Sequence, residues 1–224
     1  MDWLKKNWLW MAINLLAILP LLSLLIQMNL QFNSSGLMVT ADLPDGFRHG
    51  AGQSLGDRSP FGLMIHSTGE WAIRWLTVSL SITPLMILLG VRKLRRYRKL
   101  FGLYAFVYSL FHLIFFIADR NVISIFTESN FILGTVAFSV MLILAITSNR
   151  WSHKKLRKAW KKIHKWVYAA ALLAVLHVAL LDHGSWIPYA IILLLGFFMR
   201  LPSVKRFSGF SLGKAMPQRS VAPE

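Results

Sequence analysis

The stretch AWKKIHKWVYAAALLAVLHVALLDHG (residues 159–184) joins a basic entrance to an apolar segment of membrane-spanning character. It carries two histidines, His164 at the basic entrance and His177 among Ala, Leu and Val thirteen residues later. An ionisable side chain inside a membrane helix is costly to bury and usually faces a partner, a cavity or a cofactor. The remainder of the sequence must therefore supply the group that His177 faces.

The composition of the 224-residue chain indicates an integral membrane protein. Hydrophobic residues fill 55% of the positions and charged residues only 15%, with nine Trp and fifteen Phe. These fractions exceed those of ordinary soluble domains. The chain has no Cys, which excludes disulfides, thiolate metal sites and iron–sulfur clusters made by the chain itself.

Six apolar runs predict an all-α fold, a bundle of six transmembrane helices. A spanning helix needs about 20 apolar residues, and the shorter runs reach that length with flanking and aromatic residues. No small-residue cleavage site follows the first run, so we expect it to be a retained helix and not a removed signal peptide. The runs are residues 9–28, 71–90, 101–117, 131–147, 166–181 and 186–199.

The distribution of the basic residues that give the chain a formal charge of +16 predicts its orientation in the membrane. The expected partner of the basic surface is anionic lipid and not nucleic acid. If the N-terminus is cytoplasmic, all but four of the 25 Lys and Arg residues fall in cytoplasmic segments. Such an excess of basic residues is typical of cytoplasmic loops. We therefore expect both termini to be cytoplasmic. The four arginines on the outside are Arg48, Arg58, Arg74 and Arg120.

The expected organisation has four parts: a first transmembrane helix in residues 1–30, a periplasmic loop in 31–69, a helical core in 70–200 and a cytoplasmic tail in 201–224. The loop is rich in Gly, Ser, Asp and Pro, which favours irregular structure. The polar tail is predicted to be disordered. No internal repeat is evident.

Of the seven histidines, only His112 and His177 lie well inside apolar runs. With a rise of about 1.5 Å per residue, each lies roughly 20 Å from the cytoplasmic entry of its helix, the third and the fifth. Two imidazoles at one depth form an axial pair for a haem iron between these helices. Gly102 and Gly134 are expected to let a porphyrin approach the backbone. The alternative for each histidine alone is an interhelical hydrogen bond.

His164 extends the pattern toward the cytoplasmic side. The thirteen-residue step to His177 matches two haem ligands on one helix, one for each leaflet. On the third helix, however, the position thirteen before His112 is Lys99, preceded by Arg98, and neither is an ordinary haem ligand. Thirteen residues also turn an ideal helix by about 140° away from one face. His164 is therefore either an inner-haem ligand without a matching partner or an interfacial side chain.

Four segments carry a resemblance to a known family: residues 66–85 (HSTGEWAIRWLTVSLSITPL), 95–113 (RRYRKLFGLYAFVYSLFHL), 144–148 (LAITS) and 156–180 (LRKAWKKIHKWVYAAALLAVLHVAL). In these segments the chain resembles the ferric-reductase-like transmembrane proteins, and more closely the haem-binding membrane subunits of bacterial periplasmic protein-methionine-sulfoxide reductase systems. The resemblance covers about half of the chain. The first outside loop is longer than the family's usual one, which leaves the acceptor open.

This resemblance implies a haem b electron-transfer subunit of the bacterial inner membrane, with His112, His177 and His164 as haem-iron ligands. Quinol or a cytoplasmic flavin reductase is the implied electron donor, and a periplasmic molybdenum-cofactor subunit that repairs oxidised methionines is the implied acceptor. One or two haems are expected, and FMN and quinone remain open as further cofactors. The chain itself shows no complete catalytic site.

Five cations are candidates for holding haem propionates, a flavin phosphate or a quinone. Buried anions require cationic partners, and these side chains lie near the expected membrane surfaces. Their alternatives are orientation signals, a loop histidine and a snorkelling arginine. The candidates are Arg98, Lys99 and Lys165 at the cytoplasmic side and His66 and Arg74 at the outer side.

Three other functions compete with this one: a stand-alone membrane cytochrome with another outside acceptor, a histidine-relay transporter, and a structural assembly subunit. A proton relay requires acidic partners within the helices. The nine acids all fall in loops, tails or helix boundaries. The sequence therefore favours electron transfer over a transporter.

Overall fold

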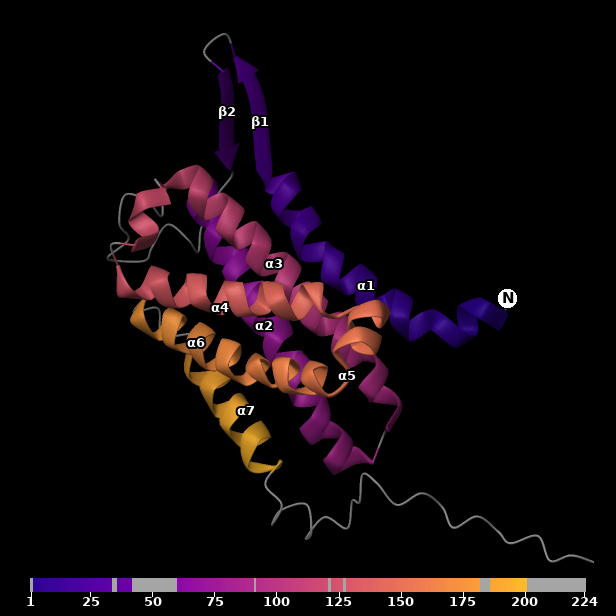
Figure 1. Cartoon of the computed structure of the whole chain (residues 1–224). Helices are drawn as coiled ribbons and strands as arrows, with labels where there is room; N and C mark the ends of the chain where they lie inside the picture. The colour runs from indigo at the N-terminus through magenta and orange to yellow at the C-terminus, as the bar shows by residue number, and fades with distance from the viewer. Residues whose placement is uncertain are drawn as a thin grey trace, which may run out of the picture.

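The structure of the chain is a computed structural model, which describes residues 2–33, 36–41, 60–90, 92–120, 122–126, 128–181 and 186–200. Most of the described residues are helical, and one antiparallel hairpin joins the first two helices (Figure 1). The elements are α1 (Asp2–Gln27), β1 (Met28–Asn33), β2 (Gly36–Ala41), α2 (Pro60–Leu89), η3 (Arg92–Tyr97), α3 (Arg98–Asp119), η4 (Val122–Phe126), α4 (Ser129–Ile146), α5 (Arg150–Ile163), η5 (His164–Trp166), α6 (Val167–Leu180) and α7 (Trp186–Phe198).

The predicted helical class is confirmed, since the six apolar runs fall on α1, α2, α3, α4, α6 and α7. Four helical segments are long and apolar enough to cross a membrane: Gly62–Leu89, Leu94–Asp119, Ser129–Ile146 and Arg150–Leu180. Asn7–Ser23 and Trp186–Phe198 are shorter apolar helices. The count of six spans therefore stays a prediction.

The connection expected to be irregular between residues 31 and 69 differs from that expectation at both ends. At its start, β1 and β2 pair in a register that joins Met28 to Ala41, Leu30 to Val39 and Phe32 to Leu37. The alternation of apolar and polar residues in MNLQFN is the period-2 signal of a strand. At its end, α2 begins at Pro60, a residue whose fixed φ suits the first helical position. Residues 42–59 of this connection and the tail 201–224 lie outside the described residues.

The basic segment before the fifth run forms a helix of its own, which the sequence analysis did not predict. α5 begins after Asn149, whose side-chain oxygen accepts a hydrogen bond from the Ser152 amide at 2.7 Å. A basic helix with one apolar face is typical of a membrane interface. A short 3₁₀ turn, η5, then connects α5 to the apolar α6.

The bundle consists of two helix pairs, α2 with α3 and α4 with α6, and α7 packs against both α2 and α6. At the basic end of the bundle, α2 ends, α3 begins, α4 ends and α6 begins. The opposite end is called the acidic end, because Glu70, Asp119 and Glu128 lie there. The two ends correspond to the cytoplasmic and outer sides expected from the charge distribution.

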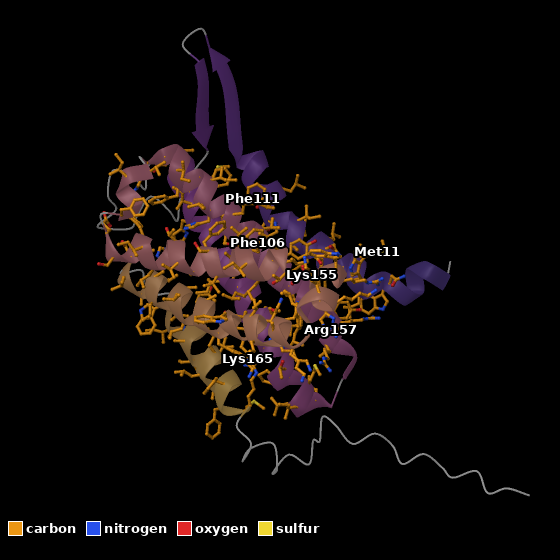
Figure 2. The ribbon with its side chains drawn as sticks, in the orientation of Figure 1. Met11, Phe106, Phe111, Lys155, Arg157 and Lys165 are labelled. Atoms are coloured by element: carbon orange, nitrogen blue, oxygen red, sulfur yellow. The ribbon has the colours of Figure 1, made fainter. Side chains whose placement is uncertain are left out.

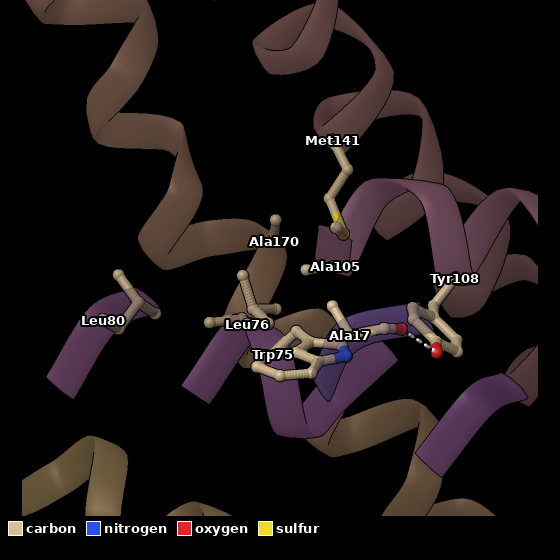
Figure 3. Packing of buried hydrophobic residues seen from close by; sticks show 9 residues of the cluster. Ala17, Trp75, Leu76, Leu80, Ala105, Tyr108, Met141 and Ala170 are labelled. Carbon is tan, nitrogen blue, oxygen red and sulfur yellow. Dashed lines mark hydrogen bonds between the residues drawn. The ribbon is translucent and has the colours of Figure 1, made fainter. Parts of the chain in front are cut away.

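The main core lies where α1 and α6 meet the α2–α3 pair (Figure 3). Tyr108 is fully buried, and its hydroxyl donates a hydrogen bond to the Ala17 carbonyl at 2.6 Å, which ties α3 to α1. Trp75 stacks on Phe101 with 5.5 Å between ring centroids. These contacts hold α3 in a fixed rotation against α2, which determines where its histidine points.

Candidate functional site

A cavity of about 520 Å³ opens among α2, α3, α4, α6 and α7 toward the acidic end. This volume lies within the range of about 300–1,000 Å³ that is usual for cofactor and ligand sites. Its walls are mainly apolar, with Ile73, Phe138 and Met141 among them, and both His112 and His177 line it. The cavity is therefore an apolar chamber with two imidazoles in its wall.

His112 on α3 is held by the neighbouring helix α2. Its Nδ1–H donates a hydrogen bond to the Ile65 carbonyl at 2.8 Å. Its ring lies flat against Gly69, where an added Cβ would come within 3.0 Å of the ring atoms Nδ1 and Cε1. Because a carbonyl only accepts, the neutral ring carries its proton on Nδ1, and Nε2 keeps a free lone pair.

His177 on α6 is held in the same way by α4. Its Nδ1–H donates to the Asn130 carbonyl at 2.6 Å, and an added Cβ on Gly134 would come within 3.0 Å of its ring. In both cases 47 positions separate the histidine from its carbonyl partner. The α2–α3 and α4–α6 pairs therefore repeat one structural unit, although no repeat is evident in the sequence.

The two rings lie near each other in the cavity wall, with 6.3 Å between their centroids and an angle of 80° between their planes. The structure thus brings together the two histidines expected at one depth. Each presents an unprotonated Nε2, which is the form of imidazole that coordinates a metal. Within the described residues, no group of three or more His, Cys, Asp or Glu side chains is arranged to hold a metal ion. A haem iron takes two imidazoles from a protein in a bis-histidine site, and the cavity wall contains two imidazoles.

The glycines differ in part from their expected role. Gly134 contacts the His177 ring directly, and Gly102 faces Ser79, whose Oγ would lie 3.4 Å from an added Cβ. Gly69, which the sequence analysis did not select, seats the other ring. In each pair the glycine lies four residues after the residue whose carbonyl bonds the histidine. This spacing could have identified Gly69, but it is recognisable only when the pairing of the helices is known.

At the acidic end, the mouth of the cavity is lined by His66, Glu70, Arg120 and Tyr189. Arg74 does not line the cavity; its guanidinium forms an ion pair with Glu70 at 2.8 Å and lies 3.4 Å from the Tyr189 hydroxyl. Arg120, which the sequence analysis treated only as an outside charge, lies over the Phe116 and Phe131 rings. Among the described residues, Arg120 thus lines the cavity, whereas Arg74 does not.

His164 occupies a different setting at the basic end. Its Nε2 lies 3.1 Å from the Thr147 hydroxyl, and its ring stacks on Trp160 with 3.9 Å between centroids. The Thr147 hydroxyl donates to the Ile143 carbonyl at 2.7 Å, so its oxygen accepts from His164. His164 also lies in η5, a 3₁₀ turn of three residues per turn, which changes its rotation relative to His177.

The three cations expected near the cytoplasmic surface are separated. Arg98 lies close enough to act electrostatically on His164. Lys99 is exposed and lines a second cavity of about 310 Å³ with Trp10 and Tyr97, toward α1. Lys165 is exposed in η5, just before α6 (Figure 2). Arg98 and Lys165 therefore lie near His164, whereas Lys99 lines the separate cavity toward α1.

Comparisons with known proteins agree with this arrangement. Residues 68–175, which include His112 and end two residues before His177, match the family model "Ferric reductase like transmembrane component". The "Protein-methionine-sulfoxide reductase heme-binding subunit MsrQ" of Yersinia pseudotuberculosis is 31% identical over 216 residues, which cover 90% of this chain and 95% of that protein.

Two other relatives match over shorter regions. The MsrQ heme-binding subunit of Bordetella pertussis is 39% identical over 126 residues, or 53% of this chain and 61% of that protein. The "Magnetosome protein MamZ" of Paramagnetospirillum magneticum is 32% identical over 145 residues, or 61% of this chain and 22% of that protein. The chain thus spans under two thirds of the length of these two relatives. No solved structure matches the chain. The coverage of the Yersinia protein and the matched family model together establish that this chain is a multi-pass membrane protein of the ferric reductase-like transmembrane family, alongside the MsrQ heme-binding subunits.

Proposed function

We propose that the chain is a haem b subunit that carries electrons across the bacterial inner membrane to a periplasmic oxidoreductase. The observation that carries this proposal is the histidine pair, two imidazoles 6.3 Å apart in the wall of one apolar cavity, each with Nδ1 bonded to a carbonyl. The names of the MsrQ relatives, which describe heme-binding subunits, support it. When bound, a haem would accept and donate one electron at a time.

The two imidazole centroids lie 6.3 Å apart in the wall of the cavity. We infer that His112 and His177 would hold the haem through their Nε2 atoms. The Ile65 and Asn130 carbonyls would fix the tautomer of the two rings and make them more basic.

The remaining walls exclude water and hold the charged edge of the porphyrin. Ile73, Phe138 and Met141 provide apolar surface for the macrocycle. Arg120 and His66 at the mouth are placed to pair with propionates, because charge-assisted hydrogen bonds to carboxylates are strong. Arg74 takes part through Glu70 and Tyr189, which it holds at the rim.

The proposed orientation places the basic end in the cytoplasm and the acidic end in the periplasm. Six spans, α1, α2, α3, α4, α6 and α7, then leave both termini cytoplasmic, in accord with the basic residues at the ends of these helices. Electrons therefore enter at the basic end, from quinol or a cytoplasmic flavin reductase, and leave from the cavity at the acidic end.

We further propose a protein-methionine-sulfoxide reductase as the periplasmic acceptor, a molybdenum-dependent subunit that repairs oxidised envelope proteins. The names of the MsrQ relatives support this choice of acceptor. The competing function is a stand-alone membrane cytochrome with another acceptor. Co-purification of the chain with a periplasmic reductase, and oxidation of the reduced chain by that protein, tests the choice between them.

A second cofactor site is proposed at the basic end, around His164 and Arg98. An inner haem, FMN or a quinone is the candidate occupant, and Lys99 and Lys165 are further candidate contacts. His164 requires a rotated ring to act as an Nε2 ligand, because its Nε2 now meets the Thr147 hydroxyl.

The haem content of the purified chain tests the main proposal. We expect at least one b-type haem per chain, reducible in an optical redox titration. His112→Ala and His177→Ala should each remove the absorbance of the outer haem, whereas His153→Ala, a histidine on the exposed helix α5, should retain it. A colourless wild-type protein, or full haem content in both ligand variants, contradicts the proposal. Two reductive waves, one of them absent in His164→Ala, would place a second haem at the basic end.

A further inference from the structure

Arg200 lies just after α7 and turns back into the bundle. Its Nη2 donates a hydrogen bond to the Leu80 carbonyl of α2. That carbonyl cannot accept the usual α-helical hydrogen bond from the residue four positions later, because that residue is Pro84, which has no N–H. Arg200 therefore satisfies a carbonyl that a proline has left free.

The close approach of α7 to α2 depends on Gly196. An added Cβ there would lie 3.3 Å from Cγ of Pro84 and 4.0 Å from Nη1 of Arg200. Gly196 is buried, in a helix whose other residues are mostly exposed. The small residue, the proline and the arginine thus form one contact between two helices far apart in the sequence.

The carbonyl contact uses only part of the guanidinium. The Nε atom of Arg200 is buried and has no hydrogen-bond partner among the described residues. A buried donor without a partner is costly, and more so when it is charged. The Tyr168 ring lies 5.2 Å from the guanidinium carbon and stacks with the cation, but it offers no acceptor to Nε.

Among the described residues, no acid lies beside Arg200 to compensate its positive charge. Burial lowers the pKa of its guanidinium from the ordinary value; the positive charge of Arg98 lowers it further, while Tyr168 acts in the opposite direction. The acids whose side chains the structure describes, Glu70, Asp119 and Glu128, lie at the other end of the bundle. Two neighbouring arginines near the membrane surface, without a described acid beside them, require an anion.

We propose that Arg200 and Arg98 form a binding site for an anionic oxygen group at the basic end, among α2, α3, α6 and α7. The guanidinium fork recognises phosphate or carboxylate oxygens, and a phosphate can come from a membrane phospholipid headgroup or from a free ligand such as FMN. This inference deepens the second cofactor site proposed around Arg98 and rests on it where the phosphate belongs to FMN. It does not involve His112 or His177, so loss of the outer haem in variants of those residues leaves it unaffected.

The test measures phosphate binding to the full-length chain. In one arm, phosphatidylglycerol retained by the protein is counted by native mass spectrometry, with phosphatidylcholine as the neutral comparison. In the other, FMN is titrated into lipid-depleted protein and followed by fluorescence, with inorganic phosphate as competitor. We expect saturable binding in one arm, which identifies the source of the phosphate.

Arg200→Gln and Arg98→Gln should each weaken that binding roughly 10- to 150-fold, the range for one lost charged hydrogen bond. Arg95→Gln, which removes an equal charge from an exposed position at the same end, should change it less than twofold. Equal losses in all three variants, or no saturable binding of either phosphate to wild type, overturn the proposal.

A double variant separates the role of Arg200 in ligand binding from its role in folding. In Pro84→Ala, the amide of residue 84 can bond the Leu80 carbonyl, so the structural need for Arg200 disappears. Arg200→Gln combined with Pro84→Ala should then fold as well as Pro84→Ala alone but bind the phosphate roughly tenfold or more weakly. Equal binding by these two proteins shows that Arg200 only supports the helix, and overturns the proposal.

Discussion

The acidic and basic ends of the bundle hold their histidines in opposite ways. At the acidic end, His112 and His177 each donate from Nδ1 to a carbonyl, rest on a glycine and leave Nε2 free. At the basic end, Nε2 of His164 is bonded to the Thr147 hydroxyl. The same residue type keeps Nε2 without a hydrogen bond in one place and uses Nε2 to bond a helix end in the other.

This difference follows from the positions at which the two helix pairs carry the same residue type. Ile65, Gly69 and His112 correspond to Asn130, Gly134 and His177 at a constant offset of 65 positions (130 − 65, 134 − 69, 177 − 112). The same offset relates Lys99 to His164 (164 − 99), two residues that cannot form a matched pair. A symmetric site arises only where both pairs supply the same ligand, which occurs at the acidic end.

The largest effect is expected from larger side chains at Gly69 and Gly134, the two glycine seats on which the imidazole rings of His112 and His177 lie. Gly69→Leu and Gly134→Leu place a side chain where even a Cβ meets the imidazole at 3.0 Å. Overpacking of this kind costs about 1–3 kcal/mol, which corresponds to roughly 5- to 150-fold faster loss of haem. The rate of haem transfer to an apo-globin measures it. Gly102→Ala, which meets only the Ser79 hydroxyl, is the control; an equal effect there would remove the special role of the two seats.

Removing the charge of Arg120 should change the midpoint potential of the outer haem without causing loss of that haem. We expect Arg120→Gln to lower the midpoint potential of the outer haem by about 1 kcal/mol, or roughly 40 mV, because a nearby cation favours the reduced state. A spectroelectrochemical titration measures the shift. Arg95→Gln at the basic end should leave that potential unchanged, and a rise in potential for Arg120→Gln would contradict the proposed position of the porphyrin edge.

Thr147→Val should affect the basic end alone. The change removes the acceptor of His164 and is expected to cost about 1 kcal/mol of stability, the usual range for a hydrogen bond. The melting temperature in detergent should fall by a few degrees. The outer-haem spectrum should stay that of wild type; a changed spectrum would show that the two ends are coupled through α4 and α6.

Lys99→His should have the smallest effect. Although the offset relates Lys99 to His164, its side chain is exposed and lines the cavity toward α1. We therefore expect no gain in haem per chain by the pyridine haemochrome assay. A second haem in this variant would show that the basic end accepts the same symmetric pair as the acidic end.

Much of the helical fold follows from the sequence. The apolar runs locate α1, α2, α3, α4, α6 and α7, because membrane-spanning segments must satisfy their backbone internally and expose hydrocarbon. The β1–β2 hairpin and α5 were missed, since a short alternating segment and a run of lysines and arginines resemble loops when a chain is read for spanning helices. The depth argument also brought His112 and His177 together correctly.

Local sequence thus determined which segments are helical, which ends are basic and which two histidines share a level, since each depends on hydrocarbon content, charge or rise per residue. Only the tertiary structure decided that Gly69 and Gly134 seat the rings, that His164 turns to Thr147 and that Arg200 reaches the Leu80 carbonyl. These contacts depend on the rotation of one helix against another. That rotation is fixed by side chains packed between segments far apart in the chain, and no local pattern records it.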